Sequence, residues 1–328
     1  MIAARASLFR FQNYITDYRT ALGRGHPMQY DAELGYVPRP NYSGKENLDG
    51  VQFTYSADGL RLHHIGAPPR VETPAILAVG DSFVQGAEVE DNSSWPAHLQ
   101  RALDRRVHNG GVGGYGLDQI TLRAERLVPS LKPAVLLLGF IPDDIDRTEL
   151  NTRNGVAKPY FRIVDGGLRR FNAPVPPPDP AAGKLDPVRQ ILGYSYLVDF
   201  TMRRLGFLDY WYGGVAGEHR AHSDGPAVAC LLMKRAAALK AAHDVRVIVV
   251  AQYPPQVWTQ PPFQREQTRR AADVLDCARK AGLETLDTFE GVRAVVARDG
   301  HGPYYINGHM NGAGNKLVAG LIADYLKR

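Results

Sequence analysis

Three continuous apolar runs dominate the hydrophobic pattern of this chain, and each ends abruptly in polar residues. They cover residues 75–79, 134–140 and 245–251. None of them alternates between apolar and polar positions, so each predicts a strand buried on both faces, as in a parallel sheet. Helical patterns separate the runs, from about residue 117 to 131 and from about 226 to 242. Strands that alternate with helices predict an α/β fold, a three-layer α/β/α sandwich with a central parallel sheet.

Two segments depart from this rhythm. Residues 1–72 begin with an amphipathic pattern up to residue 24 and continue without a sustained period, which predicts an N-terminal helix and an irregular arm with short strands. Residues 73–328 form the predicted main domain. Its segment 150–225 contains a predicted β-hairpin, a proline-rich connector and a group of aromatic residues. So long a connection is typical of a functional insertion, and we expect it to act as a lid over a ligand crevice rather than to serve only packing or a dimer contact.

The composition is that of a globular protein, with 44% hydrophobic and 22% charged residues. The formal charge of +5 comes from 39 basic and 34 acidic residues scattered along the chain, so we expect no nucleic-acid partner. No membrane span and no signal peptide are recognised, which predicts a cytoplasmic location. Cys230 and Cys277 lack metal-ligand spacing, and they suggest neither a disulfide framework nor a zinc site.

Ser82 is the strongest candidate for a reactive residue. The first apolar run leads directly into Gly80, Asp81 and Ser82. Ser82 therefore lies just past the carboxyl end of a predicted strand, where open α/β sheets place their ligand crevice. The alternative is that Asp81 or Ser82 only caps the next helix.

Two later segments supply the partners that a nucleophilic serine needs. The glycine run 110–116 allows a backbone N–H to approach a reacting oxygen, as an oxyanion hole requires. The same run satisfies the G-x-G-x-x-G dinucleotide fingerprint, but the segment before it is short and polar, which disfavours nucleotide binding. His309 lies in a loop of glycines and asparagines before a predicted last helix, residues 316–326, and is the candidate base.

Taken in order, these segments resemble the GDSL, or SGNH, hydrolase family. Residues 80–83 match the block with the nucleophilic serine, and residues 109–114 look like the second block, in which Gly114 would give an oxyanion N–H. Residues 140–144 fall where the third block carries an asparagine, and residues 307–309 fall where the last block carries an acid and the catalytic histidine. The resemblance implies a flavodoxin-like fold and serine chemistry, without a cofactor or a metal ion. Residues 35–40 also resemble bacterial members linked to polysaccharide modification.

The chain departs from the family pattern at two positions. Asp143 stands where the oxyanion-hole asparagine is expected, and an ionised carboxylate offers no donor to an oxyanion. Asn307 stands where the acid behind the histidine is expected; its amide oxygen can orient His309, but it cannot stabilise an imidazolium by charge. Asp81 and Asp144 are further candidates for binding the substrate beside Gly114.

These residues favour a serine-dependent ester hydrolase or acyltransferase. It would act through an acyl-enzyme on an O-acyl group of a carbohydrate or a small metabolite. One alternative is a catalytically impaired scaffold that binds a glycan or a small ligand without turnover. Another is different chemistry at the same pocket, nucleotide binding included. The expected partner is a small-molecule or carbohydrate ester.

Overall fold

The computed structural model describes residues 27–46, 50–63, 74–153, 156–178, 191–192, 195–207 and 218–328. The chain divides into two compact units. One contains residues 1–39, 150–160 and 170–223, and the other contains residues 40–149, 161–169 and 224–328. The predicted amphipathic helix up to residue 24 lies outside the described residues, as do residues 208–217 of the predicted insertion. The domain boundary at residue 72 and the lid role of residues 150–225 stay predictions.

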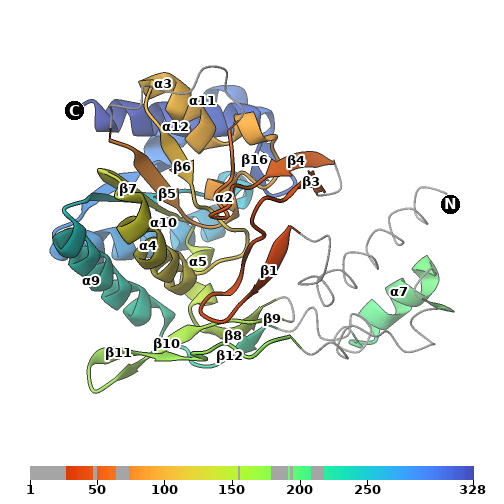
Figure 1. The fold of residues 1–328 in the computed structure, drawn as a ribbon. Helices are drawn as coiled ribbons and strands as arrows, with labels where there is room; N and C mark the ends of the chain where they lie inside the picture. The colour runs from red at the N-terminus through yellow and green to blue at the C-terminus, as the bar shows by residue number, and fades with distance from the viewer. Residues whose placement is uncertain are drawn as a thin grey trace. The chain divides into compact units, whose positions relative to one another are not determined.

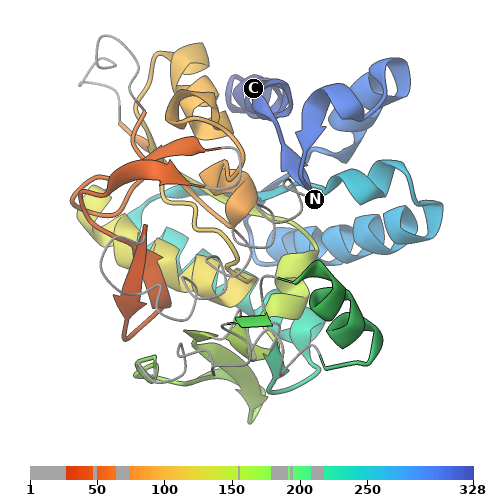
Figure 2. The ribbon, with the colours of Figure 1, turned by 90° about the vertical axis from the view of Figure 1, so that its right-hand side faces the viewer.

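The second unit is built on a five-stranded parallel sheet (Figures 1 and 2). Its strands, in spatial order, are β14 (Glu284–Asp287), β13 (Arg246–Ala251), β7 (Val135–Phe140), β5 (Ile76–Val79) and β6 (Val107–Asn109). Numbered along the chain, this is the order 2-1-3-4-5 of flavodoxin-like folds. The three predicted apolar strands are the three inner ones, so the predicted α/β class is confirmed.

Helices cover both faces of this sheet (Figure 1). On one face lie α3 (Trp95–Leu103), α11 (Phe289–Asp299) and α12 (Gly312–Leu326), and on the other lie α4 (Leu117–Leu131), α9 (Gly225–His243) and α10 (Pro261–Lys280). The predicted helices at 117–131 and 226–242 are confirmed. The last helix begins four residues earlier than predicted, because Asn311 caps it by accepting the N–H groups of Ala313 and Gly314.

Short elements complete this unit at the edges of the sheet. They are the helices α2 (Ser82–Gln85) and α5 (Asp143–Arg147), the 3-10 turns η1 (Asp91–Ser93), η2 (Pro255–Trp258) and η3 (Gly302–Tyr304), and two hairpins, β3 (Ser43–Glu46) with β4 (Val51–Thr54) and β15 (Tyr305–Ile306) with β16 (His309–Met310). The β3/β4 hairpin belongs to the predicted irregular arm, which therefore contains short strands as expected.

The first unit contains two small antiparallel sheets. One pairs β1 (Met28–Asp31) with β2 (Gly35–Pro38), and the other joins β12 (His219–Arg220), β8 (Leu150–Arg153) and β9 (Val156–Ala157). It also contains helix α7 (Tyr196–Arg204). The predicted hairpin is confirmed as β10 (Tyr160–Val164) and β11 (Gly167–Phe171), whose residues are divided between the units. Asp165 and Gly166 make its two-residue turn with φ of 52° and 75°.

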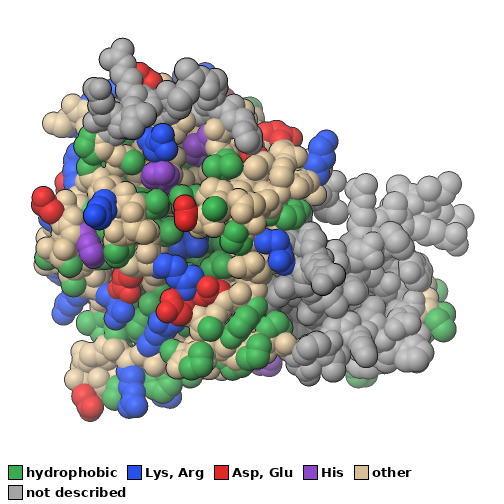
Figure 3. Space-filling view, in the orientation of Figure 1, with side chains coloured by type: hydrophobic (Ala, Val, Ile, Leu, Met, Phe, Trp, Pro, Cys, Tyr) green, Lys and Arg blue, Asp and Glu red, His purple; other side chains and the backbone are tan. Residues whose placement is uncertain are grey.

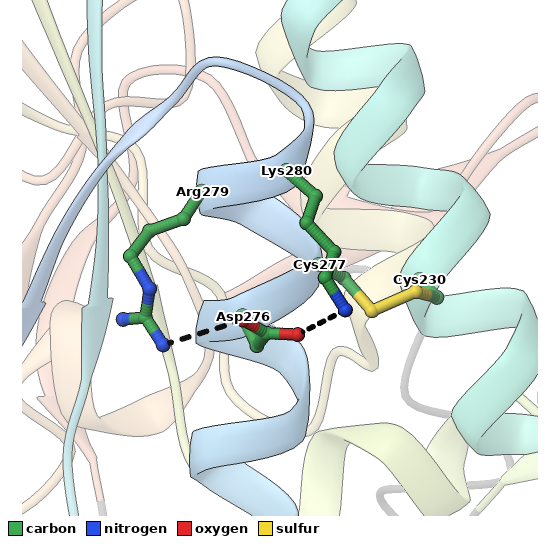
Figure 4. The surroundings of a disulfide bond; sticks show 5 residues. All are labelled: Cys230, Asp276, Cys277, Arg279 and Lys280. Carbon is green, nitrogen blue, oxygen red and sulfur yellow. Dashed lines mark ion pairs between the residues drawn. A yellow bond between two sulfur atoms is a disulfide. The ribbon is translucent and has the colours of Figure 1, made fainter.

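Cys230 of α9 and Cys277 of α10 form a disulfide bond (Figure 4). The expectation that these two cysteines stay unpaired is wrong. They are 47 residues apart in sequence, but the packing of α9 against α10 brings their Cα atoms to 5.2 Å. Asp276, beside Cys277, forms ion pairs with Arg279 and Lys280 (Figure 4).

Charge is distributed over the surface rather than gathered. On the face drawn in Figure 3, the Lys and Arg side chains of the described residues are interspersed with Asp and Glu side chains. Among these same described residues, no helix combines the length and apolar character needed to cross a bilayer.

Candidate active site

Ser82 is held at the carboxyl edge of the sheet by a sharp turn from strand to helix. It is the first residue of α2, three positions after the end of β5. Asp81 caps this short helix, since its Oδ1 accepts the Phe83 N–H at 2.9 Å. The turn needs Gly80, because a Cβ there would lie 2.0 Å from Val84 Cγ2 and 2.7 Å from the Gly139 carbonyl oxygen. The local sequence thus fixes where the Ser82 hydroxyl points.

His309 meets Ser82 from the other end of the chain. Its Nε2 lies 2.9 Å from Ser82 Oγ, and its ring packs 5.3 Å, centre to centre, from the Phe83 ring. His309 is the first residue of β16, directly after the two-residue turn of Asn307 and Gly308, whose φ angles are 49° and 88°. The structure therefore brings together the predicted nucleophile and the predicted base within hydrogen-bond distance.

The second ring nitrogen of His309 faces a residue that the sequence did not single out. Its Nδ1 is buried and has no hydrogen-bond partner, so the expectation that Asn307 orients this ring through its amide oxygen is wrong. The nearest carboxylate oxygen is Oε1 of Glu88, at 3.6 Å. Glu88 follows α2 in the acidic turn noted in the sequence, where it stood beside other acids without a signal of its own.

Backbone N–H groups are available beside Ser82. Neither the N–H of Ser82 nor that of Gly114 donates to an acceptor in the described part of the chain. The Ser82 N–H belongs to the first turn of a helix, where intrahelical acceptors are lacking. The glycine loop lies close by, since a Cβ on Gly113 would lie 3.9 Å from Ser82 Cβ. Gly114 has φ of 80°, a conformation that favours glycine.

The glycine run also allows close packing against α2. A Cβ on Gly111 would lie 2.3 Å from the Gln85 backbone nitrogen, and the Val112 N–H donates to the Gly80 carbonyl at 2.9 Å. The run follows β6, an edge strand of only three residues. Its glycines are thus explained by contact with the serine turn.

Asp81 and Asp144 do not face a substrate, and the expectation that they bind one is wrong. Both are fully buried. Arg147 forms ion pairs with both carboxylates, and its Nη1 also donates to the Tyr115 carbonyl at 3.2 Å. Burial by itself lowers the pKa of Arg147, but the carboxylates of Asp144 and Asp81 raise that pKa above its usual value. Arg147 therefore neutralises the charge of Asp81 directly beside Ser82.

Asp143 is the first residue of α5 and is partly exposed. Within the described chain, its carboxylate makes no hydrogen bond. Its part in the chemistry stays a prediction. No group of three or more His, Cys, Asp or Glu side chains in the described ranges is arranged to hold a metal ion.

Comparison with known proteins gives similarities of structure only. No protein-family model matches the chain, and no curated protein matches it in sequence. A solved α/β-hydrolase enzyme from the metagenome of Lake Arreo, Spain, is similar at a TM-score of 0.47 and 13% identity, over 79% of this chain and 97% of that one. An acetylxylan esterase from Geobacillus stearothermophilus gives 0.46 and 13%, over 78% and 95%.

A lipolytic protein of the G-D-S-L family from Desulfitobacterium hafniense is similar at a TM-score of 0.38 and 14% identity, over 77% of this chain and 99% of that one. It belongs to the family that the four sequence blocks resemble. At such TM-scores and identities, these similarities say nothing about the chemistry of the present site. That chemistry has to be argued from the residues around Ser82.

Proposed function

We propose that this protein is a serine-dependent ester hydrolase or acyltransferase. The observation that carries the proposal is the 2.9 Å contact between Ser82 Oγ and His309 Nε2. These residues are 227 positions apart in sequence, and each is the residue that the family blocks assign to nucleophile or base. A serine hydroxyl becomes a useful nucleophile only beside such a base.

In this mechanism, Ser82 Oγ attacks the acyl carbonyl carbon while His309 Nε2 takes the hydroxyl proton. The resulting oxyanion accepts hydrogen bonds from the backbone N–H groups of Ser82 and Gly114, which have no other acceptor among the described residues. His309 then gives the proton to the departing alcohol, and the acyl group stays on Ser82. Water, or a hydroxyl of an acceptor, reverses the sequence and releases an acid or a new ester.

The expected substrate is an O-acyl ester of a carbohydrate or small metabolite. Labelling by a fluorophosphonate followed by peptide mapping tests the proposal, because this probe reacts with an activated serine. We expect stoichiometric labelling at Ser82, hydrolysis of p-nitrophenyl acetate, and loss of both in Ser82→Ala. Ser93→Ala is a matched control, since Ser93 lies in η1 on the same connection. Binding of acetylated oligosaccharides with no labelling of Ser82 would favour the non-catalytic scaffold instead.

The disulfide bears on where this chemistry takes place. Disulfides persist in oxidising compartments and are rare in the cytosol. The Cys230–Cys277 bond therefore supports a periplasmic or extracellular location, in place of the cytoplasmic location expected from the sequence. Alkylation of the protein as isolated, before and after reduction, tests this point: two thiols should be modified only after reduction.

A further inference from the structure

The imidazole of His309 is satisfied on one side only. Nε2 contacts Ser82 Oγ, whereas Nδ1 is buried and without a hydrogen bond. For Nε2 to accept a proton, Nδ1 must carry its own hydrogen. A buried N–H with no acceptor costs about 1–3 kcal/mol, and proton transfer from Ser82 places a positive charge on the same ring. A base in this position needs an acceptor, preferably an anionic one, at Nδ1.

Glu88 is the carboxylate that faces this nitrogen. Its Oε1 lies 3.6 Å from Nδ1, and its side chain is 14% exposed. Within the described chain, this carboxylate has no other ion pair and no hydrogen bond. Burying an unpaired anion is unfavourable, so the histidine and Glu88 each supply what the other lacks. Hydrogen bonds of catalytic groups are often long without a substrate and shorten when one binds.

The other acid close to Ser82 is already neutralised. Asp81 Oδ2 lies 3.3 Å from Ser82 Oγ, but the same oxygen is paired with Arg147 at 3.2 Å. Its second oxygen caps α2. Asp81 therefore has little net charge to offer an imidazolium, which leaves Glu88 as the unneutralised carboxylate at the ring.

Arg61 fixes the backbone that carries Glu88. Its guanidinium is fully buried and donates to the carbonyls of Gln85 at 2.8 Å, Gly86 at 2.5 Å and Val89 at 2.6 Å. These three carbonyls lie on both sides of Glu88 in the sequence. The same guanidinium is paired with Asp91 at 2.9 Å. Gly86, with φ of 81°, ends α2 and starts this loop. The loop is thus built around a preorganised cation, and Glu88 has a defined place on it.

We infer that Glu88 is the residue that orients His309 and stabilises its protonated form, in the place that the family gives to an acid beside the histidine. The inference rests on the proposed serine mechanism and adds the source of its negative charge. The acid is supplied from the nucleophile's own connection, six residues after Ser82, instead of from the turn at Asn307. Glu88 acts through His309 and is a positioning residue.

The test compares Glu88→Gln with the matched control Glu90→Gln. Both remove one negative charge from the same loop, but the Glu90 carboxylate accepts the Gln52 N–H and is directed away from His309. We expect Glu88→Gln to lower kcat for p-nitrophenyl acetate by about 100-fold or more, with KM changed less than about threefold. Glu90→Gln should stay within about twofold of the wild type. Circular dichroism and thermal unfolding check that both variants are folded.

The pH profile separates orientation by charge from a purely structural role. Without a carboxylate at Nδ1 the imidazolium is less stable, so the acidic limb of the kcat/KM profile should move to lower pH in Glu88→Gln. Glu88→Asp should regain part of the lost kcat. A wild-type kcat and pH profile in Glu88→Gln, in a protein that loses activity in Ser82→Ala, would overturn the role of Glu88 and leave the serine mechanism intact. A wild-type protein with no labelling at Ser82 would instead refute the proposed function itself.

Discussion

Removal of the Cys230–Cys277 bond should lower the stability of the second unit by an amount that follows from its position. The bond closes a loop across 47 residues, which contains the inner strand β13 and most of α10. For a loop of this length, the lost chain entropy of the unfolded state corresponds to about 4 kcal/mol at 25 °C. With a urea dependence of about 3 kcal/mol per molar, the unfolding midpoint should fall by about 1 M or slightly more.

The assay is equilibrium urea unfolding followed by tryptophan fluorescence. The wild type is measured with and without a reductant, beside the double variant Cys230→Ser, Cys277→Ser. The reductant should lower the midpoint of the wild type to that of the double variant and leave the double variant unchanged. Turnover of the folded double variant at 25 °C should stay within about twofold, because neither cysteine lies among the residues assembled around Ser82. If the oxidised and reduced wild type unfold at the same midpoint, the entropic argument is refuted; if two free thiols titrate in protein purified without reductant, the bond itself is.

Two further predictions concern the loop and the pH response. Arg61→Met leaves Asp91 buried without its charge partner and should destabilise the protein by about 3–5 kcal/mol in thermal unfolding, whereas Arg298→Met at an exposed pair should leave the midpoint unchanged. An unchanged midpoint in Arg61→Met would disprove the proposed clamp. Burial lowers the pKa of His63 from 6.5 to about 4, so the unfolded chain binds more protons and stability should fall, by up to about 3 kcal/mol, as the pH drops from about 6.5 to 4. His63→Phe should flatten this dependence in urea titrations at several pH values, while His243→Phe at an exposed position should not; equal slopes in all three proteins would contradict it.

The inner strands of the sheet were predictable because burial on both faces excludes polar residues from them. The two outer strands were not recognised. β14, Glu284–Asp287, consists of Glu, Thr, Leu and Asp, since an edge strand is only partly covered. Helix α10 escaped for the same reason: of its 20 residues, only Gln267, Ala271, Val274, Leu275 and Ala278 are buried. Local periodicity reports burial, so elements with little burial leave a weak pattern.

The candidate site divides in the same way. Ser82 and His309 were predictable because each stands at a fixed offset from a recognisable block. Glu88 was not, because the place of its side chain depends on Arg61, which donates to the loop from a position 27 residues upstream. No spacing in the sequence reports such a contact. The disulfide is a similar case, since its two cysteines meet only through the packing of α9 against α10.

The role assigned to Glu88 also explains why the arm and the sheet belong to one compact unit. The arm contributes Arg61 to the loop carbonyls, Tyr55 to Gln85 through a 2.8 Å hydrogen bond, and the β4 backbone to Asp91. On the other side, Asn315 of α12 accepts the Trp95 N–H and donates to the Met310 carbonyl, directly after His309. Nucleophile and acid are thus set by one connection, and the base by another. A change in the arm should therefore displace Glu88 and Ser82 together relative to His309, which makes the arm part of the catalytic geometry although it contributes no reacting atom.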